Sequence, residues 1–140
     1  NIGSIFRSCD AFRVKSVYLC GITATPPNAE IHKTALGGED SVEWKYFEKT
    51  EDVIQQLRRE DYFIYSIEQV ENSTRLQNLS LDATKTYAVV FGNEVKGVSQ
   101  NVVDLSNDCL EIPQFGTKHS LNVSVAAGIV IWEFARQLII

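Results

Sequence analysis

The chain has 140 residues, of which 44 % are hydrophobic and 22 % charged, and its formal net charge is −5. This composition is typical of one ordinary globular domain with a buried core. The longest uncharged run near the C-terminus, residues 120–132, is shorter than the ~20 residues that a membrane-spanning helix needs. Because no apolar N-terminal segment resembles a signal peptide, we expect a cytoplasmic protein with no membrane partner.

Helix and strand patterns alternate along the chain, and apolar spacing and capping residues mark their boundaries. The predicted helices run from the start to about residue 12, from a cap at Thr50 or Asp52 to residue 59, over 99–105, and from 120 to the end. The predicted strands cover residues 16–20, 42–47, 62–67, 87–91 and 109–112. Residues 23–28 and 72–81 are expected to be irregular, 92–97 a turn, and 32–40 a loop or a short helix with a flexible end.

This alternation predicts an α/β fold with a mainly parallel sheet. The strand at 87–91 is apolar throughout, as expected where helices cover both faces of a sheet. Ligands bind beyond the carboxyl ends of the strands in such sheets. The turns after Phe91 and Ile112 and the start of the last helix are therefore the expected site.

Cysteine and histidine usage argues against a metal site. Cys9, Cys20 and Cys109 form no C-x-x-C pair and are expected to be buried free thiols in a reducing compartment. His32 and His119 lie in no cluster of ligands, so no metal is expected. The negative charge argues only weakly against nucleic acid, because a local basic patch suffices. Candidates for such a patch are Arg7, Arg13, Lys15, Lys33, Lys118 and His119.

Two apparent catalytic patterns fail on inspection. Residues 92–99 (GNEVKGVS) superficially resemble a phosphate-binding loop, but Val98 stands where that loop needs lysine, which disfavours nucleotide hydrolysis. Ser120 follows His119, yet adjacent residues rarely form a nucleophile and its base, and no G-x-S-x-G elbow surrounds the serine. The simplest interpretation is that Ser120 caps the last helix.

The last helix is apolar around much of its circumference and carries the small residues Ala126, Ala127 and Gly128. Core packing explains most of this apolar character. A helix that is apolar on more than one side in a small domain also predicts a homodimer interface.

Three motifs in the chain carry a resemblance to a known family. They are Asn1-x-Gly3-x-x-x-Arg7, then Phe91-Gly92-Asn93-Glu94-x-x-Gly97, then Ile112-Pro113 with Ser120-Leu121-Asn122-Val123-Ser124. In this order they resemble the motifs of the SpoU (TrmH-like) RNA ribose methyltransferases of the SPOUT superfamily, over essentially the whole chain. Residues 33–37 (KTALG) are also similar to a loop of that family.

The resemblance implies a deep C-terminal trefoil knot, the SPOUT fold, which is an exception to unknotted connections. It also implies that S-adenosylmethionine binds among the knot loops, where backbone groups read its adenine and apolar side chains enclose it. The implied cofactor-binding residues are Gly92, Asn93, Ile112, Pro113, Leu121 and Asn122. No metal is required, because the sulfonium already activates the methyl group.

The family transfers this methyl group to a ribose 2′-hydroxyl of tRNA or rRNA. Arg7 matches the family's essential arginine, and its protonated guanidinium is better suited to holding a phosphate and a developing alkoxide than to acting as a base. Asn1 would position Arg7 or the RNA, and Glu94 would orient substrate or anchor its turn. Ser120 and Asn122 would hydrogen-bond the ribose and the loops. For Glu94 and Asn122, loop bracing is the simpler alternative.

Other interpretations stay open on the sequence alone. A catalytically inactive SPOUT-fold RNA-binding or ribosome-assembly factor would retain the same pocket. A flavodoxin-like or Rossmann nucleotide module fits the alternation but explains neither Arg7 nor residues 120–122. The chain begins at Asn1 and contains no methionine, so we expect residues 1–140 to be a single catalytic domain that lacks native N-terminal sequence. The sequence does not specify which RNA is modified. It also does not specify whether Arg7 acts in the site of its own subunit or in that of a dimer partner.

Overall fold

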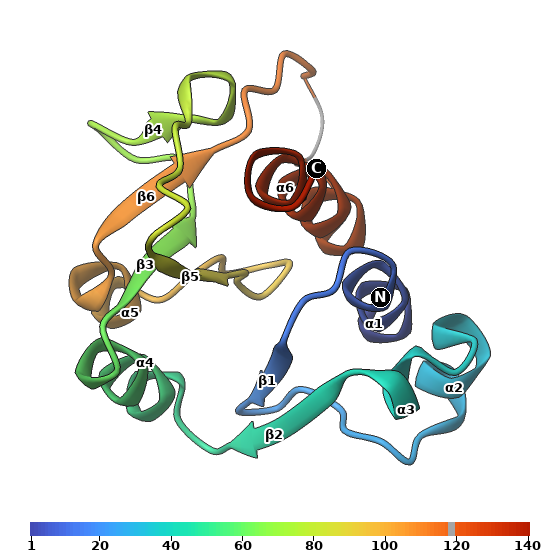
Figure 1. The fold of residues 1–140 in the computed structure, drawn as a ribbon. Coiled ribbons are helices and arrows are strands. Elements are labelled where there is room, and N and C mark those ends of the chain that lie inside the picture. Colours follow the sequence, from blue (N-terminus) through green and yellow to red (C-terminus); the bar gives the residue numbers. More distant parts are fainter. Residues whose placement is uncertain (118–119) are drawn as a thin grey trace.

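The computed structural model describes residues 1–117 and 120–140 (Figure 1). Lys118 and His119, two of the candidate basic residues, lie outside the described residues. The helices are α1 (Ile2–Ala11), α2 (Ala29–Ala35), α3 (Gly38–Ser41), α4 (Thr50–Arg59), the 3-10 turn η1 (Leu76–Asn78), α5 (Gln100–Leu105) and α6 (Val123–Leu138). The strands are β1 (Ser16–Cys20), β2 (Glu43–Phe47), β3 (Tyr62–Ile67), β4 (Thr74–Arg75), β5 (Thr86–Val90) and β6 (Asp108–Glu111).

The described strands form two sheets in which every pairing is parallel. One sheet pairs β1 with β2, and the other has the order β4-β6-β3-β5. The predicted α/β class and parallel pairing are confirmed, but the expectation of one sheet is wrong. The free edges of β1 and β5 face each other across a cavity of about 1020 Å³. They are therefore too far apart for the ~4.8 Å spacing that ladder hydrogen bonds require.

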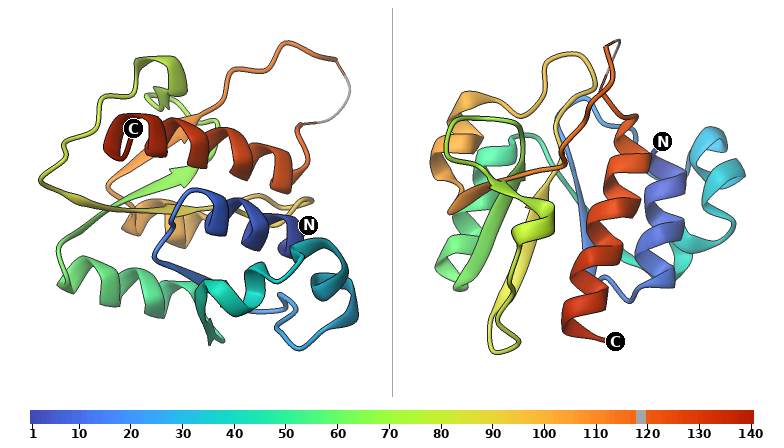
Figure 2. Two further views of the ribbon diagram at one scale, coloured as in Figure 1. Left: turned by 45° about the vertical axis from the view of Figure 1, so that its right-hand side comes forward. Right: turned by 90° about the horizontal axis from the view of Figure 1, so that it is seen from above.

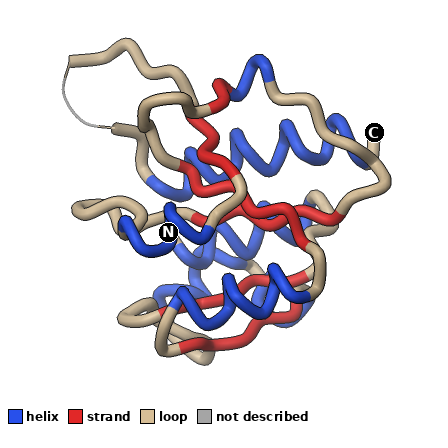
Figure 3. Tube along the Cα trace, turned by 90° about the vertical axis from the view of Figure 1, so that its left-hand side faces the viewer, coloured by secondary structure: helices blue, strands red, loops and turns tan. Residues whose placement is uncertain are grey.

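Helices cover both faces of the sheets, as the apolar strands predicted. Along β3, Ile64 packs with the buried face of α4, whereas its neighbour Tyr65 packs with Val130 of α6. This alternation places α4 and α5 on one face and α1 and α6 on the other, and the tube view shows strands between helices (Figure 3). The core is thus divided into clusters that belong to opposite faces. None of the described helices has the length and apolarity needed to cross a bilayer.

The predicted starts of two helices are wrong. The cap position of α4 is Lys49, which makes no side-chain cap, so the predicted cap at Thr50 or Asp52 is wrong. Both residues instead lie in the first turn, where an acidic side chain such as that of Asp52 favours the helix dipole. The final helix begins at Val123 rather than at Ser120, because the side chain of Asn122 provides the cap.

Residues 32–40 were predicted to be a loop or a short helix, and 72–81 to be irregular, and both regions contain short elements. Residues 29–41 form α2 and α3, joined by Leu36 and Gly37 in left-handed conformations with φ of 50° and 91°. The side chain of Asn28 starts α2 by accepting hydrogen bonds from two backbone amides. In residues 72–81, β4 pairs with β6 and η1 follows it.

Helices α1 and α6 lie side by side on the same face (Figure 2), and the rings of Phe12 and Trp132 meet edge to face at 5.7 Å. Cys9 in α1 is buried, Cys109 is buried, and Cys20 is half-buried, and all three thiols are free. Burial raises the pKa of the Cys9 thiol to about 12, so this cysteine is a packing residue rather than a nucleophile.

Gly3 allows α1 to approach α2, and this close contact generates a prediction. A Cβ atom at position 3 would lie 1.9 Å from Thr34 Oγ1 and 2.4 Å from the carbonyl oxygen of Ile31. We expect Gly3→Ala to lower the free energy of unfolding by about 1–3 kcal/mol, because overpacking forces the helices apart. Urea unfolding measures this loss. In the control Gly116→Ala, the new Cβ meets nothing within 4 Å, so no loss is expected. Equal stability of the two variants would contradict the close packing at Gly3.

Candidate functional site

Three distant segments gather at one edge of the molecule: the N-terminus, the turn after β5, and the described residues between β6 and α6, which are 112–117 and 120–122 (Figures 2 and 3). The strands of the larger sheet are parallel, so their carboxyl ends reach the same edge. This is the edge at which ligands bind in such sheets. The location of the expected site therefore agrees with the topology.

The turn after β5 is held closed by its own backbone and by Asn93. The backbone of Asn93 and Gly97 exchanges two hydrogen bonds, at 3.2 and 2.8 Å. The Asn93 side-chain oxygen accepts from the amides of Val95 and Lys96 at 2.8 and 3.2 Å. A Cβ atom at Gly92 would lie 2.1 Å from the carbonyl carbon of Gly97, so only glycine fits there. The side-chain oxygen of Asn93 thus shapes the turn. Because this oxygen is already engaged, a ligand at Gly92 and Asn93 would mainly meet backbone groups.

A hydrogen-bond network joins the three predicted motifs. The Asn1 side-chain amide donates to the carboxylate of Glu94. The Ser124 hydroxyl donates to Asn122 Oδ1 at 2.6 Å and lies 3.4 Å from Asn1 Oδ1. Asn1, Glu94 and Asn122 were all predicted as catalytic residues, and the structure brings them together. Ser124 belongs to the third motif but was not predicted as a site residue.

Two further predicted cofactor residues, Ile112 and Leu121, are joined through Gln114 in a second small cluster. The Leu121 amide donates to Gln114 Oε1 at 2.8 Å, and Gln114 Nε2 lies 3.5 Å from the carbonyl oxygen of Ile112. Ile112 and Pro113 are half-buried, and Ile112 packs against the core beneath α6. Gln114 was not predicted, because it belongs to none of the three motifs and carries no distinctive pattern of its own. Since Leu121 and Asn122 are consecutive, this cluster adjoins the network of Asn1 and Glu94.

The cavity of about 1020 Å³ between β1 and β5 reaches only part of this site. Its lining includes four predicted site residues, which are Asn1, Gly92, Asn93 and Glu94. Ile112, Pro113, Leu121 and Asn122 lie outside the lining. The structure thus brings the N-terminus and the turn after β5 to the mouth of one cavity, with the second cluster beside it.

Arg7 and Ser120 stand apart from the network. Both are exposed, and within residues 1–117 and 120–140 neither side chain makes a hydrogen bond or ion pair. The backbone of Arg7 is held, because Gly38 of α3 packs directly against the amide of Arg7. The exposed side chain of Arg7 therefore extends from a helix whose backbone is held in place at this position.

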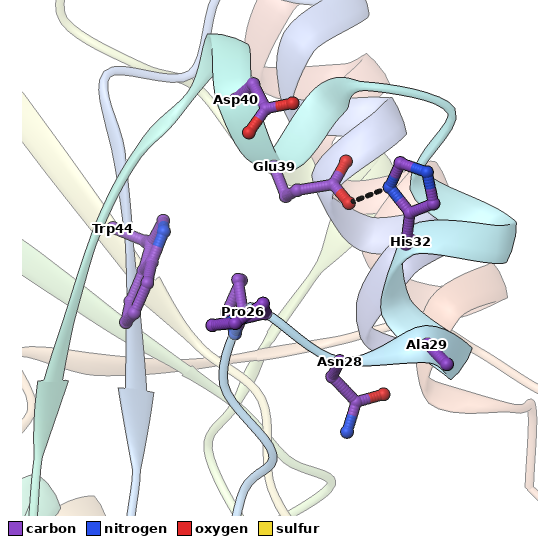
Figure 4. A pocket seen from close by; sticks show the side chains of 8 residues that line it. Pro26, Asn28, Ala29, His32, Glu39, Asp40 and Trp44 are labelled. Carbon is purple, nitrogen blue, oxygen red and sulfur yellow. Dashed lines mark hydrogen bonds and ion pairs between the residues drawn. The ribbon is translucent and has the colours of Figure 1, made fainter.

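A second cavity, of about 640 Å³, is lined by residues 26–29 and by residues of α2, α3 and β2 (Figure 4). His32 Nδ1 lies 2.9 Å from Glu39 Oε2, and this hydrogen bond lowers the pKa of the Glu39 carboxyl. Trp44 and Pro26 form other walls of the cavity. It contains none of the predicted site residues. Across the part of the chain that is described, no three His, Cys, Asp or Glu side chains converge as metal ligands would.

Comparison with known proteins identifies similar chains. The model of the SpoU rRNA Methylase family matches residues 1–132. The tRNA (guanosine(18)-2′-O)-methyltransferase of Aquifex aeolicus is 34 % identical over 140 residues, which cover 98 % of this chain and 64 % of the relative. An enzyme of the same name from Thermus thermophilus is 30 % identical over 98 % of this chain and 69 % of its own length.

A solved structure also matches the whole fold. The S-adenosylmethionine-bound rRNA methyltransferase of Sinorhizobium meliloti superposes with a TM-score of 0.88 at 26 % identity. The match covers 99 % of this chain but 52 % of that one. The chain therefore spans between about half and two thirds of the length of these relatives.

The position of the α6 cap generates a prediction. Asn122 Oδ1 accepts from the Ser124 amide at 2.9 Å, whereas Ser120 lies two residues before the cap. We expect Asn122→Ala to lower the free energy of unfolding by about 1 kcal/mol, as loss of a helix cap usually does. Ser120→Ala is the matched control and should leave stability unchanged. Thermal or urea unfolding measures both, and the opposite ranking would mean that Ser120 is the cap.

Proposed function

This chain belongs to the SpoU rRNA methylase family, and we propose that it is the catalytic domain of an S-adenosylmethionine-dependent methyltransferase acting on RNA. The acceptor is a ribose 2′-hydroxyl of tRNA or rRNA, the two RNA classes that the names of its relatives contain. The observation that carries the proposal is the network through which Asn1, Glu94 and Asn122 meet at one sheet edge. Residues of all three motifs contribute to it.

The residues at this edge fit S-adenosylmethionine. The turn at Gly92 and Asn93 and the residue after β6, Ile112, offer backbone groups for a purine. Half-buried Phe91 and Val98 supply apolar surface beside the turn. We propose that these groups hold the cofactor together with Pro113, Leu121 and Asn122. When bound, the cofactor supplies an electrophilic methyl group on a sulfonium.

Arg7 is the proposed catalytic residue that meets the RNA. A ribose hydroxyl is a weak nucleophile, so it must be oriented and its developing negative charge stabilised. The guanidinium stays protonated and exposed, which suits it to hold the neighbouring phosphate and the forming alkoxide. Asn1 bonds to Glu94, which favours a role in placing Glu94 and its turn. We propose that Ser120, whose side chain is exposed, hydrogen-bonds the ribose.

We propose that residues 1–140 act as one catalytic domain and that the segment between β6 and α6 forms the family's trefoil knot. The described residues of this segment, 112–117 and 120–122, lie at the same edge as the turn after β5, which supports the knot (Figure 2). Free thiols at all three cysteines are compatible with the proposed cytoplasmic setting. The reaction as proposed requires no metal.

A homodimer through α6 is also proposed. Val125, Ile129 and Trp132 are 49 %, 38 % and 46 % exposed, and their spacing places them on one face of the helix. An apolar stripe of this kind on a surface helix favours a self-complementary contact between two copies.

Methyl transfer to RNA tests the proposed function. The full-length protein should bind S-adenosylmethionine in isothermal titration and transfer its methyl group to RNA. Arg7→Ala should reduce kcat/KM by roughly 10²–10³-fold, as loss of a charge-stabilising donor does, without weakening cofactor binding. Arg59→Ala, which removes an exposed arginine from α4, is the control and should be fully active.

The outcomes separate the candidate functions. If the wild type does not bind S-adenosylmethionine, the proposal is wrong. If it binds the cofactor and RNA but methylates no tRNA or rRNA, the alternative of an inactive RNA-binding factor holds. Full activity of Arg7→Ala would remove Arg7 from the mechanism.

The dimer is tested by sedimentation. The wild type should sediment as two chains, and Ile129→Glu should sediment as one, because it buries a charge in the proposed apolar contact. Val70→Glu alters a residue of comparable exposure, 39 %, outside α6 and should remain dimeric. A wild type that stays monomeric at high concentration would rule out this interface.

A further inference from the structure

We propose that Glu68 is a positioning residue that holds the turn after β5 in the shape the cofactor requires. This inference rests on the proposed function, because it assumes that Gly92 and Asn93 contact S-adenosylmethionine. Glu68 belongs to none of the three family motifs quoted above, and it follows β3 rather than β5. Its role comes from its contacts across the sheet.

Glu68 connects the ends of β3 and β6 with the residue that follows the turn after β5. It follows β3 directly, and its backbone amide donates to the carbonyl oxygen of Leu110 in β6 at 3.2 Å. Its carboxylate oxygen Oε2 accepts from the amide of Val98, the residue after the turn, at 2.9 Å. Since β3 lies between β5 and β6, Glu68 is placed to fix the turn relative to both neighbours.

Gly97 shows how closely the carboxylate fits the turn. A Cβ atom at position 97 would lie 2.7 Å from Glu68 Oε2, and the backbone there has φ +71°. Glycine is therefore needed at this position both for its conformation and for the space that the Glu68 carboxylate occupies. The carboxylate and the backbone of the turn pack directly against each other.

The turn is consequently anchored at two points. Near its tip, Glu94 accepts from the Asn1 side chain, and at its base Val98 donates to Glu68. The internal bonds between Asn93 and Gly97 give the turn its shape but do not set its position on the sheet. The bond to Glu68 is charge-assisted and half-buried, which makes it stronger than a neutral surface bond. Loss of Glu68 should therefore free the base of the turn while the rest of the fold persists.

Two measurements on the full-length protein test this role. The first is amide hydrogen exchange at Val98 without cofactor, and the second is the Kd of S-adenosylmethionine by isothermal titration. Glu68→Ala should speed exchange at Val98 and weaken binding by about tenfold to a hundredfold, the range expected for one hydrogen bond to a charged group. In turnover, KM for the cofactor should rise more than kcat falls. Glu68→Gln retains an acceptor oxygen and should recover most of the affinity.

Glu71→Ala provides the matched control, because Glu71 is an exposed acid three residues away whose side chain makes no hydrogen bond within the described part of the chain. It should match the wild type in both measurements. Wild-type exchange and Kd in Glu68→Ala would overturn the inference. If Glu68→Ala does not fold, Glu68→Gln decides: near wild-type affinity supports the role of the acceptor oxygen, and a loss as large as the range above contradicts it. If the wild type binds no cofactor, the proposed function fails, while exchange at Val98 still tests the anchor.

Discussion

The side chain of Asn1 donates a hydrogen bond to the carboxylate of Glu94, and this contact joins residues that are 93 positions apart in the chain. It fixes the start of α1 against the turn after β5, and Ser124 extends the connection to the start of α6. Because α1 and α6 pack side by side, a shift of either helix would strain this connection. The geometry of the proposed site therefore depends on the packing of two helices as much as on the sheet.

Most of the parallel strands were predictable, because β1, β3 and β5 are short, largely apolar runs, the centre of β6 is apolar and buried, and β2 mixes half-buried and exposed residues. The predicted strands at 16–20 and 62–67 coincide with β1 and β3, and β5 and β6 are displaced by one residue. The two-residue strand β4 could not be found from its own sequence. It exists through pairing with β6, where the Thr74 hydroxyl also donates to Asp108 at 2.7 Å. The separation of the sheets likewise depends on how distant segments pack, which local patterns do not encode.

The site was predictable where residues belong to recognisable motifs and not where they act through distant partners. Asn1, Glu94 and Asn122 came from the family resemblance, and the structure joins them. Gln114 and Glu68 fill equally specific positions, but an isolated glutamine or glutamate carries no signal of the backbone amide to which it bonds. The cap at Asn122 illustrates the same limit, because Ser120 and Asn122 are both good capping residues and only the backbone path distinguishes them.

Glu94 and Asn122 could either brace loops or contact the substrate. Their hydrogen bonds within the protein restrict the substrate contacts of the two side chains to different degrees. A carboxylate has two oxygens with about four acceptor sites, so Glu94 can brace Asn1 through one oxygen and still accept from a substrate with the other. Asn122 has less freedom, because its side-chain oxygen already accepts from the amide and the hydroxyl of Ser124 at 2.9 and 2.6 Å. Its remaining polar group is the side-chain NH₂, which can only donate. A hydrogen bond from the Asn122 side chain to the ribose or the cofactor must therefore be made to an acceptor oxygen or nitrogen of that ligand.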